Sequence, residues 1–316
     1  MKKIVITGGL GHIGSYVVDS ILKKFKGVHL IIIDTLHSQR YPTLFNLNKN
    51  NLNKVSFYDQ DIRDFNENNK IFANTKIFIH LAARTEAEAS LSKKKEFLSN
   101  NLQATKKAVE IVKKNDSLLI FPSSTSVYGS SIKNDLIFEN DHTKLIPQSP
   151  YAEIKLKEEK LIKNNLKKNK YVILRLGTVI GVSTGMRFHT AVNKFSYQAS
   201  LNKKITIWRS AFGQIRPYAT LEDIFKSILI FINKPNEKIN ETYNVVTKNL
   251  SVNEIVNFIK KKKKVRISYV YSKIMNKMSY KISNKKLRNI GFKPQINIRK
   301  EIIETLKLFN FQNEIN

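Results

Sequence analysis

The stretch Met1-Lys-Lys-Ile-Val-Ile-Thr-Gly-Gly-Leu-Gly-His-Ile-Gly14 decides the fold. Its apolar run over residues 4–6 is typical of a strand that is buried on both faces of a parallel sheet. Gly8, Gly11 and Gly14 then permit a sharp turn, a close approach of backbone to ligand, and tight packing of the next helix on the strand. Apolar residues at helical spacing follow, and the first turn of such a helix offers unpaired N–H groups to a pyrophosphate. The stretch therefore predicts a strand, a turn and a helix that bind a dinucleotide.

A second apolar run, over residues 28–33, ends at Asp34, which is 20 residues after Gly14. A carboxylate at this place accepts hydrogen bonds from the ribose hydroxyls of an adenosine and repels a 2′-phosphate. The glycine spacing alone would also suit an ordinary turn between a strand and a helix. Together with Asp34 it favours NAD over NADP.

The composition limits the class of protein. The chain has 316 residues, 41% of them hydrophobic, and no cysteine, which excludes a disulfide framework and a thiolate nucleophile or metal site. We predict no metal site. No apolar segment is long enough to span a bilayer, and the first strand begins near residue 3, so we expect a cytoplasmic protein with no membrane partner.

The formal net charge of +30 would suit a nucleic-acid-binding protein. The lysines, however, are spread along the chain among many asparagines and isoleucines, which indicates compositional bias more than a binding patch. The densest run, residues 260–264, follows an apolar helical stripe, where cations suit the end of a helix. We therefore expect no specific nucleic-acid partner, although a basic surface attracts anionic substrates.

Polar residues follow the next predicted strands, at residues 54–58, 76–81 and 117–121. Asp61 and Ile62 come after the first of these, where they are placed to meet an adenine ring by a hydrogen bond and by packing. The small Ala82 and Ala83 come after the second and would let the backbone approach the cofactor. Ligands of open α/β sheets bind at these carboxyl ends of strands.

The residues that indicate chemistry come after the fifth strand. The loop Pro122-Ser-Ser-Thr-Ser-Val-Tyr-Gly129 contains Ser124, and a helix opens at Ser149-Pro-Tyr-Ala-Glu-Ile-Lys155. Tyr151 and Lys155 are four residues apart, so they share one face of that helix. An ammonium beside a phenol favours the phenolate, so Tyr151 can act as a base, with Ser124 bound to the same substrate oxygen. Such pairs also arise by chance in lysine-rich helices, but the position after a serine-rich loop favours catalysis.

At these residues the chain resembles the extended short-chain dehydrogenase/reductase family, in its nucleotide-sugar epimerase and dehydratase branch. The resemblance covers nearly the full length, at residues 7–14, Asp34, residues 61–64, 80–83, Asn101, residues 123–129, Tyr151 with Lys155, and residues 175–181. It implies an α/β fold in which a Rossmann doubly wound parallel sheet binds NAD over residues 1–177, with a return strand near 243–247. Residues 178–316 then form mainly a smaller, interleaved substrate domain.

The resemblance also implies the roles of individual residues. The catalytic set is Ser124, Tyr151 and Lys155. The expected NAD contacts are Gly8, Gly11, His12, Ile13, Gly14, Asp34, Asp61, Ile62, Leu81, Ala82, Ala83, Asn101, Tyr151 and Lys155. The expected contacts of a nucleotide-diphosphate sugar are Arg84, Ser124, Thr125, Thr178, Arg187, His189 and Arg216. Arg216 is the principal diphosphate ligand. For Arg187, an arginine on the protein surface is an equally good interpretation, and for His189, a histidine at the start of a helix is.

Two further expectations follow from the resemblance. Residues 205–208 and 213–218 match a hairpin of the substrate domain. The helices at 92–114 and 151–169 are those that pair as a four-helix bundle in dimeric relatives, so a homodimer is expected.

Three functions compete: a nucleotide-sugar epimerase, a dehydratase or reductase on the same scaffold, and a non-catalytic NAD sensor. The complete catalytic set disfavours the sensor. Dehydratases of this family carry an Asp–Glu pair where this chain has Thr125 and Ser126, neither of which can act as a carboxylate acid or base. Residues 84–88 and Thr178 depart from the usual galactose-epimerase pattern, so the sugar and its nucleotide stay open. We expect an NAD-dependent epimerase of carbohydrate biosynthesis that inverts C4 through a transient 4-keto sugar.

Overall fold

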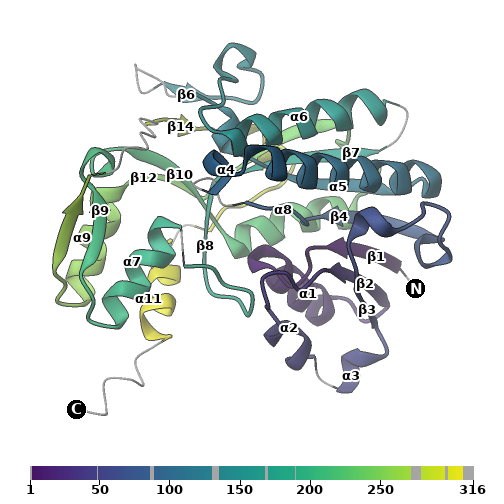
Figure 1. Cartoon of the computed structure of the whole chain (residues 1–316), viewed down its shortest axis with the longest axis horizontal. Coiled ribbons are helices and arrows are strands. Elements are labelled where there is room, and N and C mark those ends of the chain that lie inside the picture. Colours follow the sequence, from purple (N-terminus) through teal and green to yellow (C-terminus); the bar gives the residue numbers. More distant parts are fainter. Residues whose placement is uncertain are drawn as a thin grey trace.

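The computed structural model describes residues 2–47, 49–85, 89–129, 135–167, 170–188, 190–271, 279–295 and 298–308. Its main sheet consists of β1 (Lys2–Thr7), β2 (Val28–Asp34), β3 (Val55–Asp59), β4 (Thr75–His80), β5 (Leu118–Ser124), β7 (Tyr171–Leu176) and β11 (Glu241–Val245). The strand order is β11-β7-β5-β4-β1-β2-β3, and every neighbouring pair is parallel (Figure 1). Chain order runs outward in opposite directions from β1 and β4, which creates the crevice where such sheets bind ligands. The expected Rossmann sheet is confirmed.

Alternate residues of the central strands face opposite layers of helices. Ile4 and Ile6 pack with α1 (His12–Lys24) and α8 (Leu221–Asn233), whereas Val5 packs with α5 (Lys94–Asn115) and α6 (Pro150–Asn165). Both layers are apolar because each strand is covered on both faces, which explains the unbroken runs of Ile, Val and Leu in the sequence. The two layers hold the carboxyl ends of β1, β4 and β5 at one edge of the sheet.

Smaller sheets lie beside the main one (Figure 1). One contains β8 (Thr178–Ile180), β10 (Ile215–Thr220) and β12 (Lys248–Ser251), a second pairs β9 (Ile205–Trp208) with β13 (Ile267–Val270), and a third pairs β6 (Leu136–Ile137) with β14 (Lys281–Ile282). Helices α7 (Ala191–Ser200), α9 (Val252–Lys262) and α11 (Ile298–Lys307) pack against the first two of these sheets around a separate apolar core. Between β10 and β12 the chain returns through α8 and β11 to the edge of the main sheet, and it then re-enters the smaller sheets.

Short elements complete the described chain. They are the helices α2 (Pro42–Phe45), α3 (Lys49–Leu52), α4 (Ala89–Ser92) and α10 (Lys285–Arg288), and the single 3-10 turns Ile62–Asp64, Lys70–Phe72, Thr125–Val127, His142–Lys144 and Arg209–Ala211. Of the helices that the structure describes, none combines the length and the apolar composition that crossing a membrane requires.

The predicted hairpin at residues 205–218 is wrong. Strand β9 pairs in parallel with β13, whereas β10 pairs with β8 and β12 in a different sheet. The connection contains the 3-10 turn Arg209–Ala211 in place of a tight hairpin turn. Ile205 and Ile207 are buried in the core with α7 and α9, and in this position β9 pairs with a strand 62 residues further along the chain.

Candidate active site

The glycine turn after β1 has no room for side chains at two positions. Gly8 has a φ of +68°, and a Cβ atom there would lie 2.6 Å from the backbone nitrogen of Ala82. A Cβ on Gly14 would lie 2.7 Å from the Cα of Gly9. Gly11 caps α1 in extended backbone, and among the described residues no side chain caps that helix. The first turn of α1 is therefore presented at the crevice as a backbone anion site.

Asp34 ends β2 beside this turn. Its carboxylate accepts hydrogen bonds from the backbone N–H of Leu10 at 3.0 Å and of Leu36 at 3.2 Å. Burial raises the pKa of Asp34, although both hydrogen bonds and the charge of Arg40 act in the opposite direction. The carboxylate thus holds the glycine turn against the loop after β2. A backbone cradle closed by an acid at the end of β2 fits the diphosphate and ribose of NAD.

The other expected cofactor residues have different surroundings. Ile62 is buried, and Leu81, Ala82 and Ala83 are half-buried after β4. The Asp61 carboxylate accepts hydrogen bonds from the backbone and the guanidinium of Arg63, which lower its pKa. The buried Asn101 side chain binds the backbone N–H and C=O of Arg84 at 2.8 and 3.0 Å, so it fixes the loop that follows β4.

The three expected catalytic residues converge where β5 ends and α6 begins. Ser149 caps α6 by accepting a hydrogen bond from the N–H of Ala152 at 3.2 Å, and this start places Tyr151 in the first helical turn. Lys155 follows one turn later with a side chain that is 5% exposed. Its ammonium lies 4.5 Å from the centre of the Phe121 ring.

Electrostatics at this point act on the phenol and the ammonium together. Burial, together with the charge of Glu158, raises the pKa of Tyr151 overall, although the charges of Lys155 and Arg187 and a hydrogen bond with Ser124 act in the opposite direction. Burial by itself would lower the pKa of Lys155, but the neighbouring Glu158 and Tyr151 raise it overall. The arrangement keeps the lysine protonated beside the phenol, where its positive charge favours the phenolate and opposes the effect of burial.

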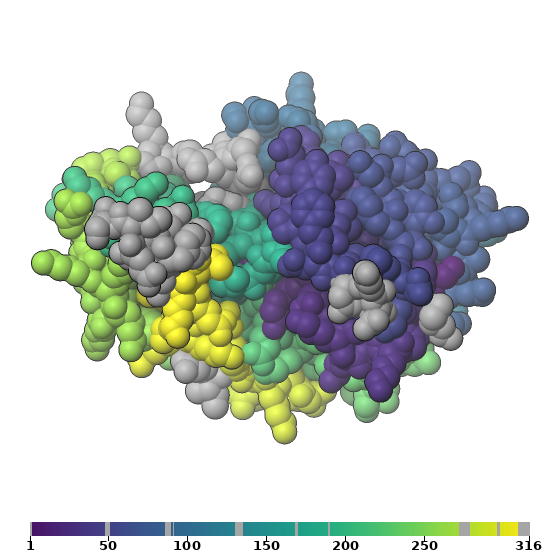
Figure 2. All heavy atoms as spheres, turned by 90° about the horizontal axis from the view of Figure 1, so that it is seen from below, coloured from purple at the N-terminus to yellow at the C-terminus, as the bar shows by residue number. Residues whose placement is uncertain are grey.

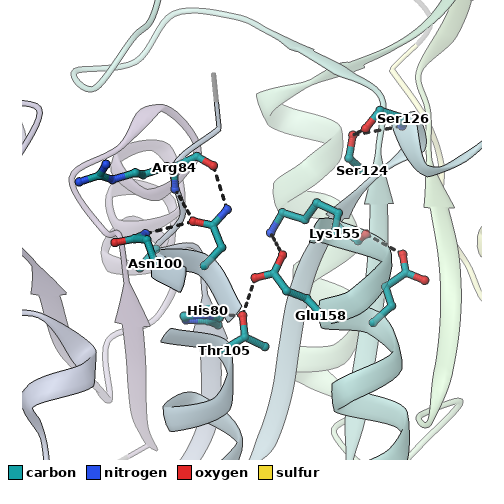
Figure 3. Close-up of polar contacts among 12 residues, drawn as sticks. His80, Arg84, Asn100, Thr105, Ser124, Ser126, Lys155 and Glu158 are labelled. Atoms are coloured by element: carbon teal, nitrogen blue, oxygen red, sulfur yellow. Dashed lines mark hydrogen bonds and ion pairs between the residues drawn. The ribbon is translucent and has the colours of Figure 1, made fainter. Parts of the chain in front are cut away.

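Ser126 supports Ser124 in a way that the sequence did not indicate. Its hydroxyl donates to Ser124 Oγ at 2.9 Å, and its backbone N–H approaches the same oxygen at 3.2 Å (Figure 3). Because Ser124 accepts both, its own proton is left for the hydrogen bond with the phenol of Tyr151. The adjacent Thr125, expected to contact substrate, is buried.

A row of buried polar side chains lies behind Lys155. Thr7 Oγ1 lies 2.7 Å from His80 Nδ1, and His80 Nε2 lies 3.2 Å from Thr105 Oγ1. Thr105 donates to Glu158 at 2.6 Å, and Glu158 pairs with the Lys155 ammonium at 3.1 Å (Figure 3). Burial and the charge of Lys155 lower the pKa of His80 to about 3. Of Lys155, Glu158 and Thr105, only Lys155 was predicted from the sequence as a site residue.

Glu159, which follows Glu158 on α6, has different partners. Glu159 accepts hydrogen bonds from Arg175 at 2.7 and 2.9 Å and from Ser123 at 2.6 Å. Arg175 also donates to the Tyr128 hydroxyl at 2.6 Å. These buried contacts tie α6 to the ends of β5 and β7.

The arginines expected at the substrate are bound to protein groups. Arg84 pairs with Glu96, Arg187 donates to Thr85, and Arg216 donates to Gln214 at 3.1 Å. Arg187 is near enough to Tyr151 to lower its pKa, so the structure brings Arg84, Arg187 and the catalytic set to one region. Arg216 lies on β10 beside the Tyr280 ring, and Thr178 opens β8. His189 lies outside the described residues.

The loop over residues 181–185 closes on the glycine turn, which the sequence did not predict. His12 Nε2 lies 2.8 Å from the Gly181 carbonyl oxygen, and the Ser183 hydroxyl donates to the carbonyl of His12 at 2.9 Å. A Cβ on Gly185 would lie 2.6 Å from the carbonyl carbon of Gly11. Figure 2 shows teal residues from the middle of the chain between the purple N-terminal part and the green and yellow C-terminal part.

Comparison with known proteins agrees with this geometry. The chain is 31% identical to a putative UDP-glucose 4-epimerase of Methanocaldococcus jannaschii over 95% of both chains. It is 26% identical to human dTDP-D-glucose 4,6-dehydratase, over 99% of this chain and 91% of that one. A solved UDP-N-acetylglucosamine 4-epimerase of Methanobrevibacter ruminantium, in complex with UDP-N-acetylmuramic acid, matches with a TM-score of 0.85 and 26% identity over 99% of each chain.

A family model described as NAD dependent epimerase/dehydratase matches residues 4–245. The expected enzyme class and the expected cofactor, NAD, are thereby confirmed. With its Rossmann sheet, its glycine cradle and these relatives, the chain belongs to the NAD dependent epimerase/dehydratase family.

Proposed function

We propose that this enzyme epimerises a nucleotide sugar at C4 through a transient 4-keto sugar. The observation that carries the proposal is the convergence of Ser124, Tyr151 and Lys155 at a site where residues 125 and 126 are threonine and serine. This set can move a hydroxyl proton, and it lacks the carboxylate pair that elimination of water would use at those two positions.

Each residue of the set has a distinct task. NAD, when bound, supplies a reversible hydride acceptor. Tyr151 accepts the proton of the C4 hydroxyl and later returns it. Lys155 stabilises the phenolate by its charge, and Ser124 donates a hydrogen bond to the sugar oxygen as that oxygen gains negative character.

Other residues hold the substrate in this proposal. Arg216 is assigned to the diphosphate, and Arg84, Arg187, Thr125, Thr178 and His189 are assigned to the sugar and its nucleotide. The substrate part of the chain begins after residue 177, and α5 and α6, which pack against each other, are the proposed surface of a homodimer. The named relatives act on UDP- and dTDP-sugars, which supports a nucleoside-diphosphate sugar as the substrate class.

A 4,6-dehydratase is the alternative, and the human relative favours it. The two activities differ in their products. Purified enzyme incubated with a panel of UDP- and dTDP-sugars should convert one of them into a mixture of C4 epimers, resolved by NMR, without added NADH. Release of a 6-deoxy-4-keto sugar would establish the dehydratase, and stoichiometric consumption of NADH would establish a reductase.

A further inference from the structure

Glu158 lies inside the protein next to the catalytic lysine. Its side chain is 0% exposed, one of its carboxylate oxygens lies 3.1 Å from the Lys155 ammonium, and the other accepts a hydrogen bond from the Thr105 hydroxyl at 2.6 Å. Tyr151, Lys155 and Glu158 follow at intervals of four and three residues, so all three lie on one face of α6. A carboxylate in such a place is costly to bury unless charge and hydrogen bonds compensate it.

The hydrogen bonds around Glu158 run in one direction. Since Thr105 donates to Glu158, it accepts from His80 Nε2, and Thr7 then donates to His80 Nδ1. This assigns neutral His80 the tautomer with its proton on Nε2, in keeping with a pKa of about 3. The row starts at the end of β1, beside the glycine turn, and every donor in it supports the ionised form of Glu158.

We propose that Glu158 is a positioning residue that fixes the Lys155 ammonium beside Tyr151 and balances part of its positive charge. The neighbouring Glu159 does not take this part, because Arg175 and Ser123 occupy its oxygens. Lys155 therefore has a fixed counter-ion 3.1 Å from its ammonium. This inference rests on the proposed catalytic role of Tyr151 and Lys155.

The charge balance has a consequence for pH dependence. Glu158 raises the pKa of Tyr151 and that of Lys155. Removing its negative charge should lower both, so that the phenolate forms at lower pH and the ammonium is lost at lower pH. Both limbs of the activity profile then move towards acid. The other titratable or charged groups that act on this site are Glu159 on α6, His80 on β4, Arg187 before α7, Arg175 through Glu159, and Asp61 through His80.

The test is Glu158→Gln, which keeps the shape of the side chain and removes its charge. We expect the pH–rate profile to move to lower pH by at least about half a unit, with a lower kcat and little change in KM. Glu158→Asp should restore the position of the profile because it restores the charge. Glu139→Gln is the matched control, because Glu139 is also buried and its carboxylate accepts a hydrogen bond from the backbone N–H of Asn244. This variant should leave the pH–rate profile unchanged.

A second measurement needs no substrate. Ultraviolet difference titration of each protein against its Tyr151→Phe counterpart reports the phenol of Tyr151 alone, and it should show the same acid shift for Glu158→Gln. If the phenol shifts but no sugar is turned over, the proposed function fails and the inference stands. If Glu158→Gln lowers thermal stability but leaves both the phenol and the profile in place, Glu158 is only structural and the inference is wrong.

Thr105→Val decides the matter if Glu158→Gln does not fold. It removes the 2.6 Å donor that holds the Glu158 carboxylate in place beside the Lys155 ammonium. A smaller acid shift in the phenol titration is expected, and an unchanged phenol in this variant would overturn the proposal.

Discussion

The proposed cofactor side and the proposed substrate side of the crevice are held by different kinds of contact. On the cofactor side, contacts between backbones at Gly8, Gly14 and Gly185 leave no space for side chains, and Asp34 binds backbone amides. On the substrate side, long side chains such as Arg187 and Arg216 bind other side chains, Thr85 and Gln214. We propose that backbone geometry fixes NAD binding, whereas exchangeable side-chain contacts determine the sugar nucleotide.

Tyr151 lies between the two sides, and Tyr151→Phe should have the largest effect on turnover. Turnover should fall by about 100- to 10,000-fold, because the base is lost while the glycine turn is untouched. NAD retained through purification, measured after denaturation, should equal that of the unaltered protein. A near-normal rate would show that the proton is taken by another group.

Lys155→Ala should lower turnover and move the acid limb of the profile to higher pH, opposite to Glu158→Gln. The lysine charge lowers the pKa of Tyr151, so without it the phenolate forms only at higher pH. The change also leaves Glu158 buried without its ion-pair partner, which should cost about 3–5 kcal/mol of unfolding free energy. Denaturant unfolding should show part of that loss recovered in the double variant Lys155→Ala/Glu158→Gln.

Gly8→Ala tests the cofactor side directly. The left-handed φ of +68° and the 2.6 Å approach to the Ala82 nitrogen predict a loss of about 1–3 kcal/mol in unfolding free energy, together with loss of retained NAD. Gly27→Ala is the control, because no heavy atom lies within 4 Å of its added Cβ. If the two variants lost equal unfolding free energy and equal amounts of NAD, close backbone contacts would not be what distinguishes the cofactor side from the substrate side.

Arg216→Ala tests the substrate side and should have the smallest effect. Loss of a charged hydrogen bond to the diphosphate should raise KM by about 10- to 100-fold, with NAD retention and stability unchanged. Arg209→Ala removes an arginine from the same region, one that binds Tyr271, and should leave KM as it is. A loss of NAD in the Arg216 variant would contradict the separation of the two sides.

The same contrast explains what could be predicted from the sequence. The strands of the main sheet, the glycine turn and Asp34 were predictable, because their signals are local spacing and buried apolar runs. Pairing of β9 with β13 and the contact of Gly185 with Gly11 depend on segments far apart in the chain. No local pattern encodes them.

Glu158 shows the limit most clearly. The run Lys157-Glu158-Glu159-Lys160 contains charges of both signs, which is typical of a solvated helix face. Both lysines are indeed exposed, but both glutamates are buried. Their burial depends on Thr105 and Arg175, which come from other elements. The catalytic set itself was predictable as a hypothesis from the Tyr–Lys spacing after a serine-rich loop.

The central claim is that Tyr151 and NAD act on one sugar carbon without net oxidation, and a nucleotide sugar deuterated at C4 tests it most directly. In ordinary water, epimerisation predicts a C4 epimer that keeps its deuterium, with no NADH accumulated and no water lost from the sugar. An epimer that has exchanged its C4 deuterium for a solvent proton, or a product that carries the deuterium at another carbon, would contradict the account.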